Sequence, residues 1–235
     1  MSGILAGLKG GLIVSCQAHE GEPLHGPGFM AGMALAAEMG GASAVRANGG
    51  ADIKAIKNRI NLPVIGIKKV LLEDGSIFIT PDLKSAEEII EAGADIVAVD
   101  CTFRRTVSGK PGFELIEEIK KHFDIPVMAD ISNAEEGLNA LKHGADIIST
   151  TLSGYTPDSP CLEQPDFGLI TEIRNTIGTR AYINAEGRFS KPEEVVKALE
   201  LGADFVTVGS AITRPAWITG NFANAIKNYA EKGCL

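Results

Sequence analysis

Short apolar segments recur along the whole chain, and stretches with the apolar spacing of helices lie between them. Runs of this length that are apolar on both alternating faces are typical of buried parallel strands. The sequence predicts strands at residues 11–17, 42–48, 63–69, 95–102, 126–132, 146–153, 180–188 and 204–211. Helices are predicted, among other places, at residues 30–39, 83–92, 134–143 and 192–201.

The joins between helices and strands repeat a common pattern. Residues 91–97, 143–148 and 201–206 each run from a helix end through glycine, a small residue and aspartate into a strand, and residues 39–45 are a variant. Glycine is a common residue at such a helix end. Eight strands alternating with helices predict a (β/α)8 barrel, the TIM-barrel fold, because a doubly wound sheet more usually has five or six strands. No linker or shift of composition divides the chain, so residues 1–235 are expected to form a single domain.

The third predicted strand ends in two lysines, Lys68 and Lys69. Successive side chains of a strand point to opposite faces, so the two lysines cannot both face the same pocket. Lysines at the end of a buried strand are not explained by packing. We therefore expect one of them to act in chemistry and the other to be solvated.

Composition and charge narrow the range of functions. The residues are 45% hydrophobic and 6% aromatic, the net charge is -8, and the pI is near 5.1. A nucleic-acid surface needs clustered lysine and arginine, so this balance argues against nucleic-acid binding. No apolar run approaches the ~20 residues of a membrane span, and the first residues do not resemble a signal segment. A soluble, cytoplasmic protein without a membrane partner is expected.

The cysteines and histidines do not predict a metal site. Cys16, Cys101, Cys161 and Cys234 are widely spaced, form no Cys-x-x-Cys pair, and are expected to be reduced thiols. The four histidines fall in a loop or at helix ends, where surface or capping roles are expected. No dinucleotide-binding fingerprint is present either. We therefore predict neither a metal nor a cofactor.

Polar residues gather at the carboxyl ends of the predicted strands. In a (β/α)8 barrel these ends build the active site, whereas the opposite ends serve stability. The polar strand ends are Gln17, Arg46, Asn48, Lys69, Asp100, Thr102, Asp130, Ser132, Thr150, Thr151, Asn184 and Glu186. The strand starts carry little apart from Asp95, Asp146 and Asp204, which we interpret as structural turn residues. The pattern predicts a functional pocket on one rim of the barrel.

The last two predicted strands add a candidate anion site. Glu186-Gly187-Arg188 ends the seventh strand, while residues 208–215 end the eighth and open a helix. Glycine lets backbone N–H groups approach a phosphate, and the N-terminus of a helix adds a favourable dipole. Phosphate is common at this place in barrels. Arg214 and Arg188 are the candidate cations.

At these residues the chain resembles the N-acetylmannosamine-6-phosphate 2-epimerases. The segments that carry the resemblance are residues 11–18, 44–49, 63–67 with Lys69, 128–132, 149–156, 185–188 and 208–215. The resemblance implies a cofactor-independent (β/α)8 enzyme that acts on a small phosphosugar in sialic acid breakdown. Such an enzyme interconverts the 6-phosphates of N-acetylmannosamine and N-acetylglucosamine.

The resemblance also implies roles for single residues. The family's Gly-Ile-x-Lys motif falls on residues 66–69 and its Ala-Glu-Gly motif on residues 185–187, which implies that Lys69 and Glu186 are catalytic. The residues expected to bind the sugar are Gln17, Arg46, Asp130, Thr151 and Tyr155. Those expected to bind the phosphate are Gly187, Arg188, Gly209, Ser210 and Arg214. The chain departs from the family pattern at residues 70–72 and at Thr106-Val107, which concerns loop contacts and substrate affinity more than the chemistry.

Inversion at C2 of an N-acetylated aldose phosphate requires ring opening, removal of the C2 proton and its return on the other face. A lysine with a pKa near 10.4 is less than ~0.1% neutral at pH 7, so a base role for Lys69 needs a pKa of roughly 7 or 8. Burial and Arg46 would lower this pKa, whereas Glu186 would raise it. We expect Lys69 to take and give the C2 proton and Glu186 to assist ring opening or the second transfer. Arg46 and Gln17 would hold the sugar and steady the enolate.

Two other functions stay open at this point. Another phosphosugar barrel enzyme would use Lys69 as the Schiff base of an aldolase, or would catalyse an Amadori-type isomerisation. A barrel that binds a sugar phosphate without catalysis would be expected to lack Lys69 or Glu186, and both are present.

The predicted C-terminal helix bears on the oligomeric state. Residues 214–232 include Trp217, Phe222, Ile226 and Tyr229 at an apolar spacing that suits packing on the helix's own barrel or on a partner. The family resemblance favours a homodimer.

Overall fold

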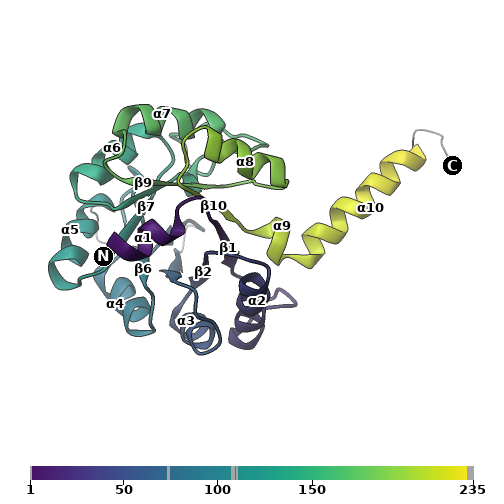
Figure 1. Cartoon of the computed structure of the whole chain (residues 1–235), viewed down its shortest axis with the longest axis horizontal. Coiled ribbons are helices and arrows are strands. Elements are labelled where there is room, and N and C mark those ends of the chain that lie inside the picture. The colour runs from purple at the N-terminus through teal and green to yellow at the C-terminus, as the bar shows by residue number, and fades with distance from the viewer. Residues whose placement is uncertain (1, 73–74, 107–108, 110, 232–235) are drawn as a thin grey trace.

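The computed structural model describes residues 2–72, 75–106, 109 and 111–231, so Val107, Lys232 and Cys234 lie outside the described residues. Its centre is a closed barrel of eight parallel strands in the order β1-β10-β9-β8-β7-β6-β3-β2 (Figure 1). The barrel strands are β1 (Leu12–Cys16), β2 (Ala44–Asn48), β3 (Val64–Ile67), β6 (Ile96–Asp100), β7 (Val127–Asp130), β8 (Ile147–Ser149), β9 (Tyr182–Glu186) and β10 (Phe205–Val208). The predicted (β/α)8 barrel is confirmed.

Helices surround the barrel on its outer face (Figure 1). They are α2 (Pro27–Met39), α3 (Gly50–Lys57), α4 (Leu83–Glu91), α5 (Phe113–His122), α6 (Ala134–Lys142), α7 (Phe167–Ile177) and α8 (Pro192–Glu200). The short α1 (Ser2–Leu8) places Leu5 and Leu8 in the apolar interior of the barrel. Among the described residues, no helix is long and apolar enough to cross a membrane.

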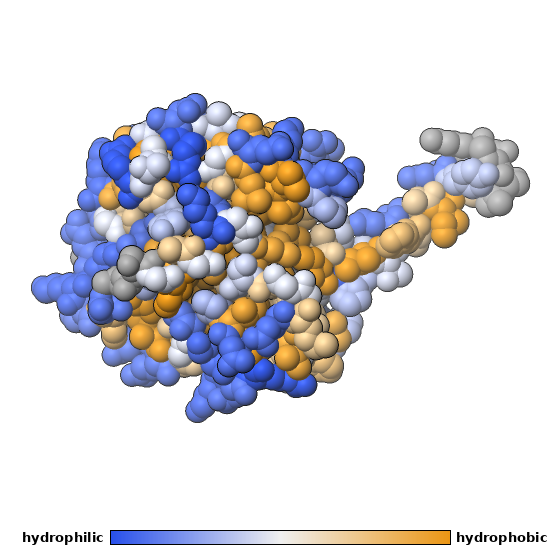
Figure 2. All heavy atoms as spheres, viewed as in Figure 1, coloured by the Kyte–Doolittle hydropathy of each residue, from blue (hydrophilic) through white to orange (hydrophobic). Residues whose placement is uncertain are grey.

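The chain after β10 leaves the barrel. It forms the single turn α9 (Ser210–Thr213) and then the long α10 (Pro215–Glu231), which projects away from the barrel (Figure 1). Figure 2 shows hydrophobic side chains along α10 and at its junction with the barrel. None of the residues of α10 is buried, although the alternation of strands and helices would place an eighth helix against β10.

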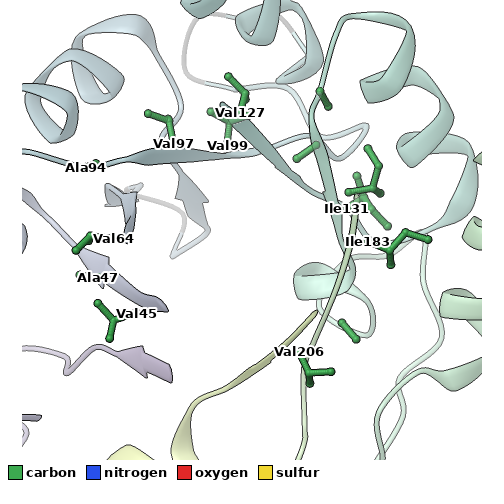
Figure 3. Close-up of a cluster of buried hydrophobic side chains, with 14 of the residues drawn as sticks. Val45, Ala47, Val64, Ala94, Val97, Val99, Val127, Ile131, Ile183 and Val206 are labelled. Atoms are coloured by element: carbon green, nitrogen blue, oxygen red, sulfur yellow. The ribbon is translucent and has the colours of Figure 1, made fainter. Parts of the chain in front are cut away.

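Alternation along the strands divides the core into two layers. One face of each strand points into the barrel, where Ile13, Ala44, Ile65, Ile96, Met128, Ile147 and Phe205 are fully buried. The other face packs beneath the helices, and Figure 3 shows part of that layer, with Val45, Val64, Val97, Val127, Ile183 and Val206. Strands that are buried on both faces explain the continuous apolar runs of the sequence.

The repeated aspartates have the predicted structural role. The carboxylates of Asp95, Asp146 and Asp204 accept hydrogen bonds at 2.8 Å from the backbone N–H groups of Val64, Val127 and Ile183, respectively. Each aspartate also pairs with a cation from the helical layer, namely Lys57, Lys120 or Arg174. These bonds tie the amino end of one strand to its neighbour, at the rim opposite the predicted pocket.

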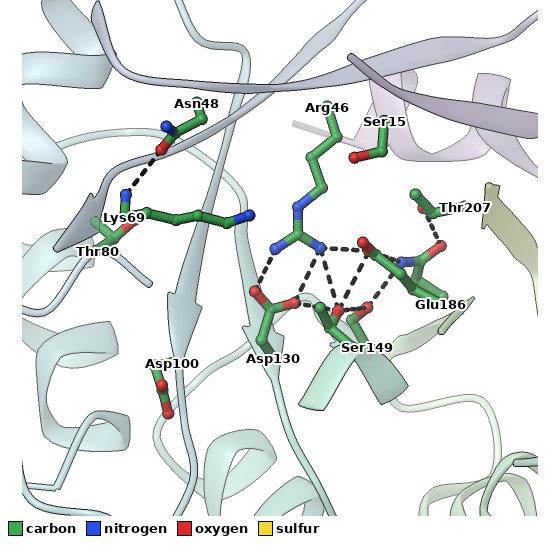
Figure 4. A network of polar contacts seen from close by, with 12 residues as sticks. Ser15, Arg46, Asn48, Lys69, Thr80, Asp100, Asp130, Ser149, Glu186 and Thr207 are labelled. Carbon is green, nitrogen blue, oxygen red and sulfur yellow. Dashed lines mark hydrogen bonds and ion pairs between the residues drawn. The ribbon is translucent and has the colours of Figure 1, made fainter. Parts of the chain in front are cut away.

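Two features at the end of β3 place the paired lysines. A Cβ atom on Gly66 would lie 2.7 Å from Cβ of Ala94, so only glycine lets this strand pack so closely under the neighbouring helix. Nζ of Lys68 forms an ion pair at 2.8 Å with Glu88 on α4, outside the barrel. Lys69 faces the opposite way (Figure 4), which confirms the prediction that the two lysines do not face the same pocket.

The third predicted strand is shorter than expected. Barrel pairing ends at Ile67, and Lys69 opens a separate antiparallel hairpin of β4 (Lys69–Leu71) and β5 (Ile77–Ile79). Thr80 fixes the turn, because its hydroxyl accepts a hydrogen bond from the Lys68 N–H at 3.0 Å and its own N–H donates to the Lys68 carbonyl at 2.7 Å. The predicted sixth strand, residues 146–153, likewise stops early, and a 3-10 turn, η1 (Thr150–Leu152), follows it.

Candidate active site

A cavity of about 950 Å³ opens at the carboxyl ends of the barrel strands. Its wall contains every predicted site residue except Asp130, which is fully buried and joins the site through Arg46. The predicted residues in the wall are Gln17, Arg46, Lys69, Thr151, Tyr155, Glu186, Gly187, Arg188, Gly209, Ser210 and Arg214. The structure thus brings together residues that the sequence spreads over more than half of its length.

Arg46 is the centre of the polar network in this cavity (Figure 4). It is 1% exposed and comes from β2. Its Nη1 donates to Asp130 Oδ1 at 3.2 Å and also to Glu186, while Nη2 donates to Asp130 Oδ2. Nη1 lies 3.1 Å from the hydroxyl oxygen of Thr151 as well. The guanidinium therefore joins two carboxylates from β7 and β9 in one buried cluster.

Burial and neighbouring charges shift the pKa values of this cluster in opposite directions. Burial alone would lower the pKa of Arg46, but Asp130 and Glu186 outweigh it and raise that pKa. Burial raises the pKa of Glu186, and Arg46 opposes the rise. One cation thus serves two carboxylates, and of the two Glu186 is the one that reaches the cavity.

Lys69 lies beside this cluster, and its side chain points across the barrel toward Arg46 (Figure 4). Its backbone is held by a hydrogen bond at 2.8 Å from its N–H to Oδ1 of Asn48. Burial and then Arg46 lower the pKa of Lys69 from 10.5 to about 8, against the opposing effect of Glu186. The amine is therefore suited to exchange a proton near neutral pH.

Among the described residues, two polar atoms of the site are buried without a hydrogen-bond partner, namely Oε1 of Gln17 and Nε of Arg46. The amide nitrogen of Gln17 is held by Oγ of Ser15 at 2.7 Å, which fixes the direction of the free oxygen. Buried polar atoms are usually paired, so such atoms next to a cavity are available to a ligand. One is an acceptor and the other a donor.

The end of the cavity at β9 and β10 carries the predicted phosphate residues. Gly187 has a φ of 121°, a conformation that favours glycine, while a Cβ atom on Gly209 would be in ordinary contact with Cβ of Ser15 at 3.6 Å. Arg214 reaches this region but forms an ion pair at 3.0 Å with Glu22, from the loop after β1. An anion that binds Arg214 would therefore have to compete with Glu22.

Arg188 is more constrained than the sequence indicates. It has a φ of 60°, and its guanidinium donates to the carbonyls of Ser153 at 2.7 Å and Gln164 at 2.9 Å. The same group lies 5.5 Å from the ring centre of Tyr155. These contacts fasten the loop after η1 to the end of β9, so much of the hydrogen-bonding capacity of Arg188 is already used.

Metal ligands and reactive thiols are not gathered at this site. Within the part of the chain that the structure describes, no group of three or more His, Cys, Asp and Glu residues could hold a metal ion. Burial raises the pKa of Cys16 to about 12 and that of Cys101 well above its ordinary value, so both thiols stay protonated.

Comparison with known proteins identifies the family. A family described as "Putative N-acetylmannosamine-6-phosphate epimerase" matches residues 30–228. This chain belongs to that epimerase family. A curated relative from Caldanaerobacter subterraneus subsp. tengcongensis, named as a 2-epimerase of this kind, is 53% identical over 95% of this chain and 94% of its own. A second, from Cutibacterium acnes, is 46% identical over 95% of this chain and 97% of its own.

A solved structure of the same family superposes closely. The N-acetylmannosamine-6-phosphate 2-epimerase from Clostridium perfringens matches with a TM-score of 0.89 at 44% sequence identity. The match covers 94% of this chain and 96% of that one. The (β/α)8 fold and the family membership therefore agree.

Several residues of this cavity were not predicted from the sequence to belong to it. Ser15, His19, Arg104, Thr207 and Trp217 also line the cavity. His19 is largely exposed at the rim, and its partial desolvation, Lys69 and Arg214 lower its pKa. For Ser15 and Thr207 a signal was present, because each lies two residues before a predicted site residue on its strand and so shares its face. Two of the positions at which the chain departs from the family pattern are Leu71 and Val107. Leu71 is exposed on β4, and Val107 lies outside the described residues.

Proposed function

We propose that this protein is an N-acylglucosamine-6-phosphate 2-epimerase, which interconverts N-acetyl-D-mannosamine 6-phosphate and N-acetyl-D-glucosamine 6-phosphate. The observation that carries the proposal is Lys69, an amine with a pKa of about 8 at the wall of a cavity that also holds Glu186. Epimerisation next to an aldehyde needs a base of this kind and a group that assists the second proton movement. Family membership supports the same reaction.

The proposed reaction begins with ring opening to the free aldehyde, which acidifies the C2 proton. Lys69 in its neutral form removes that proton, and the electron pair moves onto the aldehyde oxygen to give an enolate. The guanidinium of Arg46, whose Nε is unpartnered, would stabilise the developing negative charge. The Lys69 ammonium then returns a proton to the opposite face of C2, with Glu186 assisting this second transfer. The enolate electron pair forms the new C2–H bond as the aldehyde is restored, and ring closure gives the other epimer.

Other residues would hold the substrate. Oε1 of Gln17 is free to accept a hydrogen bond from a sugar hydroxyl or the amide N–H. Thr151 and Asp130 hold Arg46 and, through it, Glu186 in place by hydrogen bonds. Tyr155 is 62% exposed and lies in the wall of the cavity. Gly187, Gly209, Ser210 and Arg214 would take the 6-phosphate, with Arg188 holding the adjoining loop.

The test is proton NMR of the protein with N-acetylmannosamine 6-phosphate in heavy water. We expect the gluco epimer to appear with deuterium at C2, and Lys69→Met to show neither product nor exchange. Lys68→Met is the matched control, because Lys68 faces α4 and should leave the rate unchanged. Absence of both product and exchange with the unaltered protein would overturn the proposal.

We also propose a homodimer in which a second copy covers α10. Trp217, Phe222, Ile226 and Tyr229 are 41%, 71%, 67% and 54% exposed, and a helix with this much apolar surface is typical of an interface. Replacing Phe222 and Ile226 by serine should give a monomer in light scattering, and an unchanged mass would contradict this.

A cytoplasmic location is proposed as well, because Cys16, Cys101 and Cys161 are free thiols.

A further inference from the structure

A row of buried polar side chains lies one step below the proposed catalytic residues, inside the barrel. Ser149, Asn184 and Thr207 are 0%, 0% and 1% exposed and come from β8, β9 and β10. At this depth a barrel interior is normally filled by branched apolar residues. The proposed reaction does not use these three residues directly, so their presence needs another explanation.

The donor and acceptor of each hydrogen bond in this row can be assigned by starting from Asp130. Asp130 is paired with Arg46 and, as a carboxylate, can only accept. The Thr151 hydroxyl, 2.6 Å from Asp130 Oδ1, must therefore donate to it. Ser149 lies 2.8 Å from the same Thr151 oxygen, and with the Thr151 proton already committed, Ser149 is the donor there.

The orientation of Asn184 is then determined as well. Because Ser149 has given its proton to Thr151, its oxygen accepts from Nδ2 of Asn184 at 2.7 Å. On the other side the Thr207 hydroxyl donates to Oδ1 of Asn184 at 2.9 Å. Both partners require the same placement of the amide oxygen and nitrogen, so the side chain is locked in one of its two orientations.

This orientation turns a donor toward Glu186. The second hydrogen of Nδ2 faces Oε2 of Glu186, with the two heavy atoms 3.4 Å apart. The same carboxylate oxygen is approached by Arg46 and by Thr151 at 3.2 Å. If the amide were turned over, its oxygen would oppose the carboxylate and displace it.

We propose that Asn184, locked by Thr207, is a positioning residue that aims the Glu186 carboxylate into the cavity and keeps it a proton acceptor. This inference rests on the proposed function, because it assumes that Glu186 takes part in the reaction. The charged groups that act on Glu186 are Arg46 from β2, Asp130 from β7 and Lys69 from the end of β3. Asn184 adds a fixed donor to this set from its own strand.

The test uses the pH profile of kcat/KM. The reaction needs both Lys69 and Glu186 in their deprotonated forms. With unaltered protein, kcat/KM should therefore fall tenfold per pH unit below the pKa of Lys69, and a hundredfold per unit below the pKa of Glu186. The change of slope at the pKa of Glu186 is the lower break of the profile. Asn184→Asp places a further carboxyl beside Glu186, in addition to Asp130, so the lower break should move up by about one pH unit. Thr207→Val, which removes one of the two hydrogen bonds that hold the amide in this orientation, should move the break in the same direction by a smaller amount.

Thr207→Ser is the matched control, because it keeps the hydroxyl and should keep the lower break in place. If Asn184→Asp and Thr207→Val reduce kcat/KM by the same factor at every pH, the role is structural and the proposal is overturned. An unaltered protein without a lower break would also overturn it. If Asn184→Asp fails to fold, the Thr207 pair decides the question. Loss of C2 exchange in the unaltered protein would instead overturn the proposed function.

Discussion

Arg46 on β2 and Asp130 on β7 form a two-pronged ion pair across the inside of the barrel. The two strands are not neighbours, since β3 and β6 lie between them. Both side chains are buried, with 1% and 0% exposure, and Glu186 joins them from β9. The polar end of the barrel is thus held by side-chain bonds between strands that the sheet does not pair.

Removing the cation of this cluster should destabilise the fold. Arg46→Met would leave two buried carboxylates without their partner, which typically costs about 3–5 kcal/mol of the free energy of unfolding. Urea unfolding at pH 7 measures this loss. Lys68→Met, which breaks a half-exposed pair with Glu88, should cost less than about 1 kcal/mol. Equal losses in the two variants would contradict the interpretation.

Catalysis should depend on deprotonation of Lys69. Its pKa is lowered from 10.5 to about 8, so about a tenth of the amine is neutral at pH 7 instead of less than ~0.1%. We expect kcat/KM to rise with pH and to level off above an apparent pKa near 8. Initial rates between pH 6 and 9.5 measure this limb. A limb centred near 10 would show that the lysine is not perturbed in the working enzyme.

The same lysine should weaken the fold. Because its pKa is lower in the folded chain, the unfolded chain binds more protons between pH 8 and 10.5, and stability rises with pH in that window. At pH 7 the full effect is present, and it lowers the free energy of unfolding by about 2 kcal/mol after allowance for the partial exposure of Lys69. Lys69→Met should therefore be inactive but more stable than the unaltered protein at pH 7. The gain should vanish near pH 10.5, and a gain independent of pH would point to packing instead.

Sequence patterns were sufficient for the barrel and for most of the cavity wall. Strand ends meet at one rim by the geometry of the fold, so residues such as Gln17, Lys69 and Glu186 could be grouped without coordinates. The rule of alternating faces was enough to separate Lys68 from Lys69. Local chemistry also identified the turn aspartates, because Asp95 and Asp146 each accept a hydrogen bond from the first N–H group of the preceding barrel strand.

The parts that sequence could not predict depend on distances between segments far apart in the chain. The guanidinium of Arg188 bonds two loop carbonyls, and nothing in its neighbours along the chain indicates those partners. The lock on Asn184 needs residues from three strands at once. The hairpin that begins at Lys69 depends on hydrogen bonds to Thr80. The sequence of α10 predicts a helix with an apolar side, but it does not show whether that helix packs on the barrel or projects from it.

The ion pair between Glu22 and Arg214 leads to a last prediction, on affinity. Their side chains are 32% and 34% exposed and 3.0 Å apart, and Arg214 is the residue we propose for the 6-phosphate. If phosphate displaces Glu22, Glu22→Gln should lower KM for the phosphorylated substrate by about threefold, the scale of an exposed ion pair, and leave kcat unchanged. Glu20→Gln makes the same change of net charge two residues away on an exposed site and should leave KM unaltered. Steady-state kinetics of both variants at low salt decide between the outcomes. Equal effects of the two variants on KM would indicate a general effect of net charge on the substrate. A rise of KM in Glu22→Gln would show that Glu22 holds Arg214 in place for the ligand.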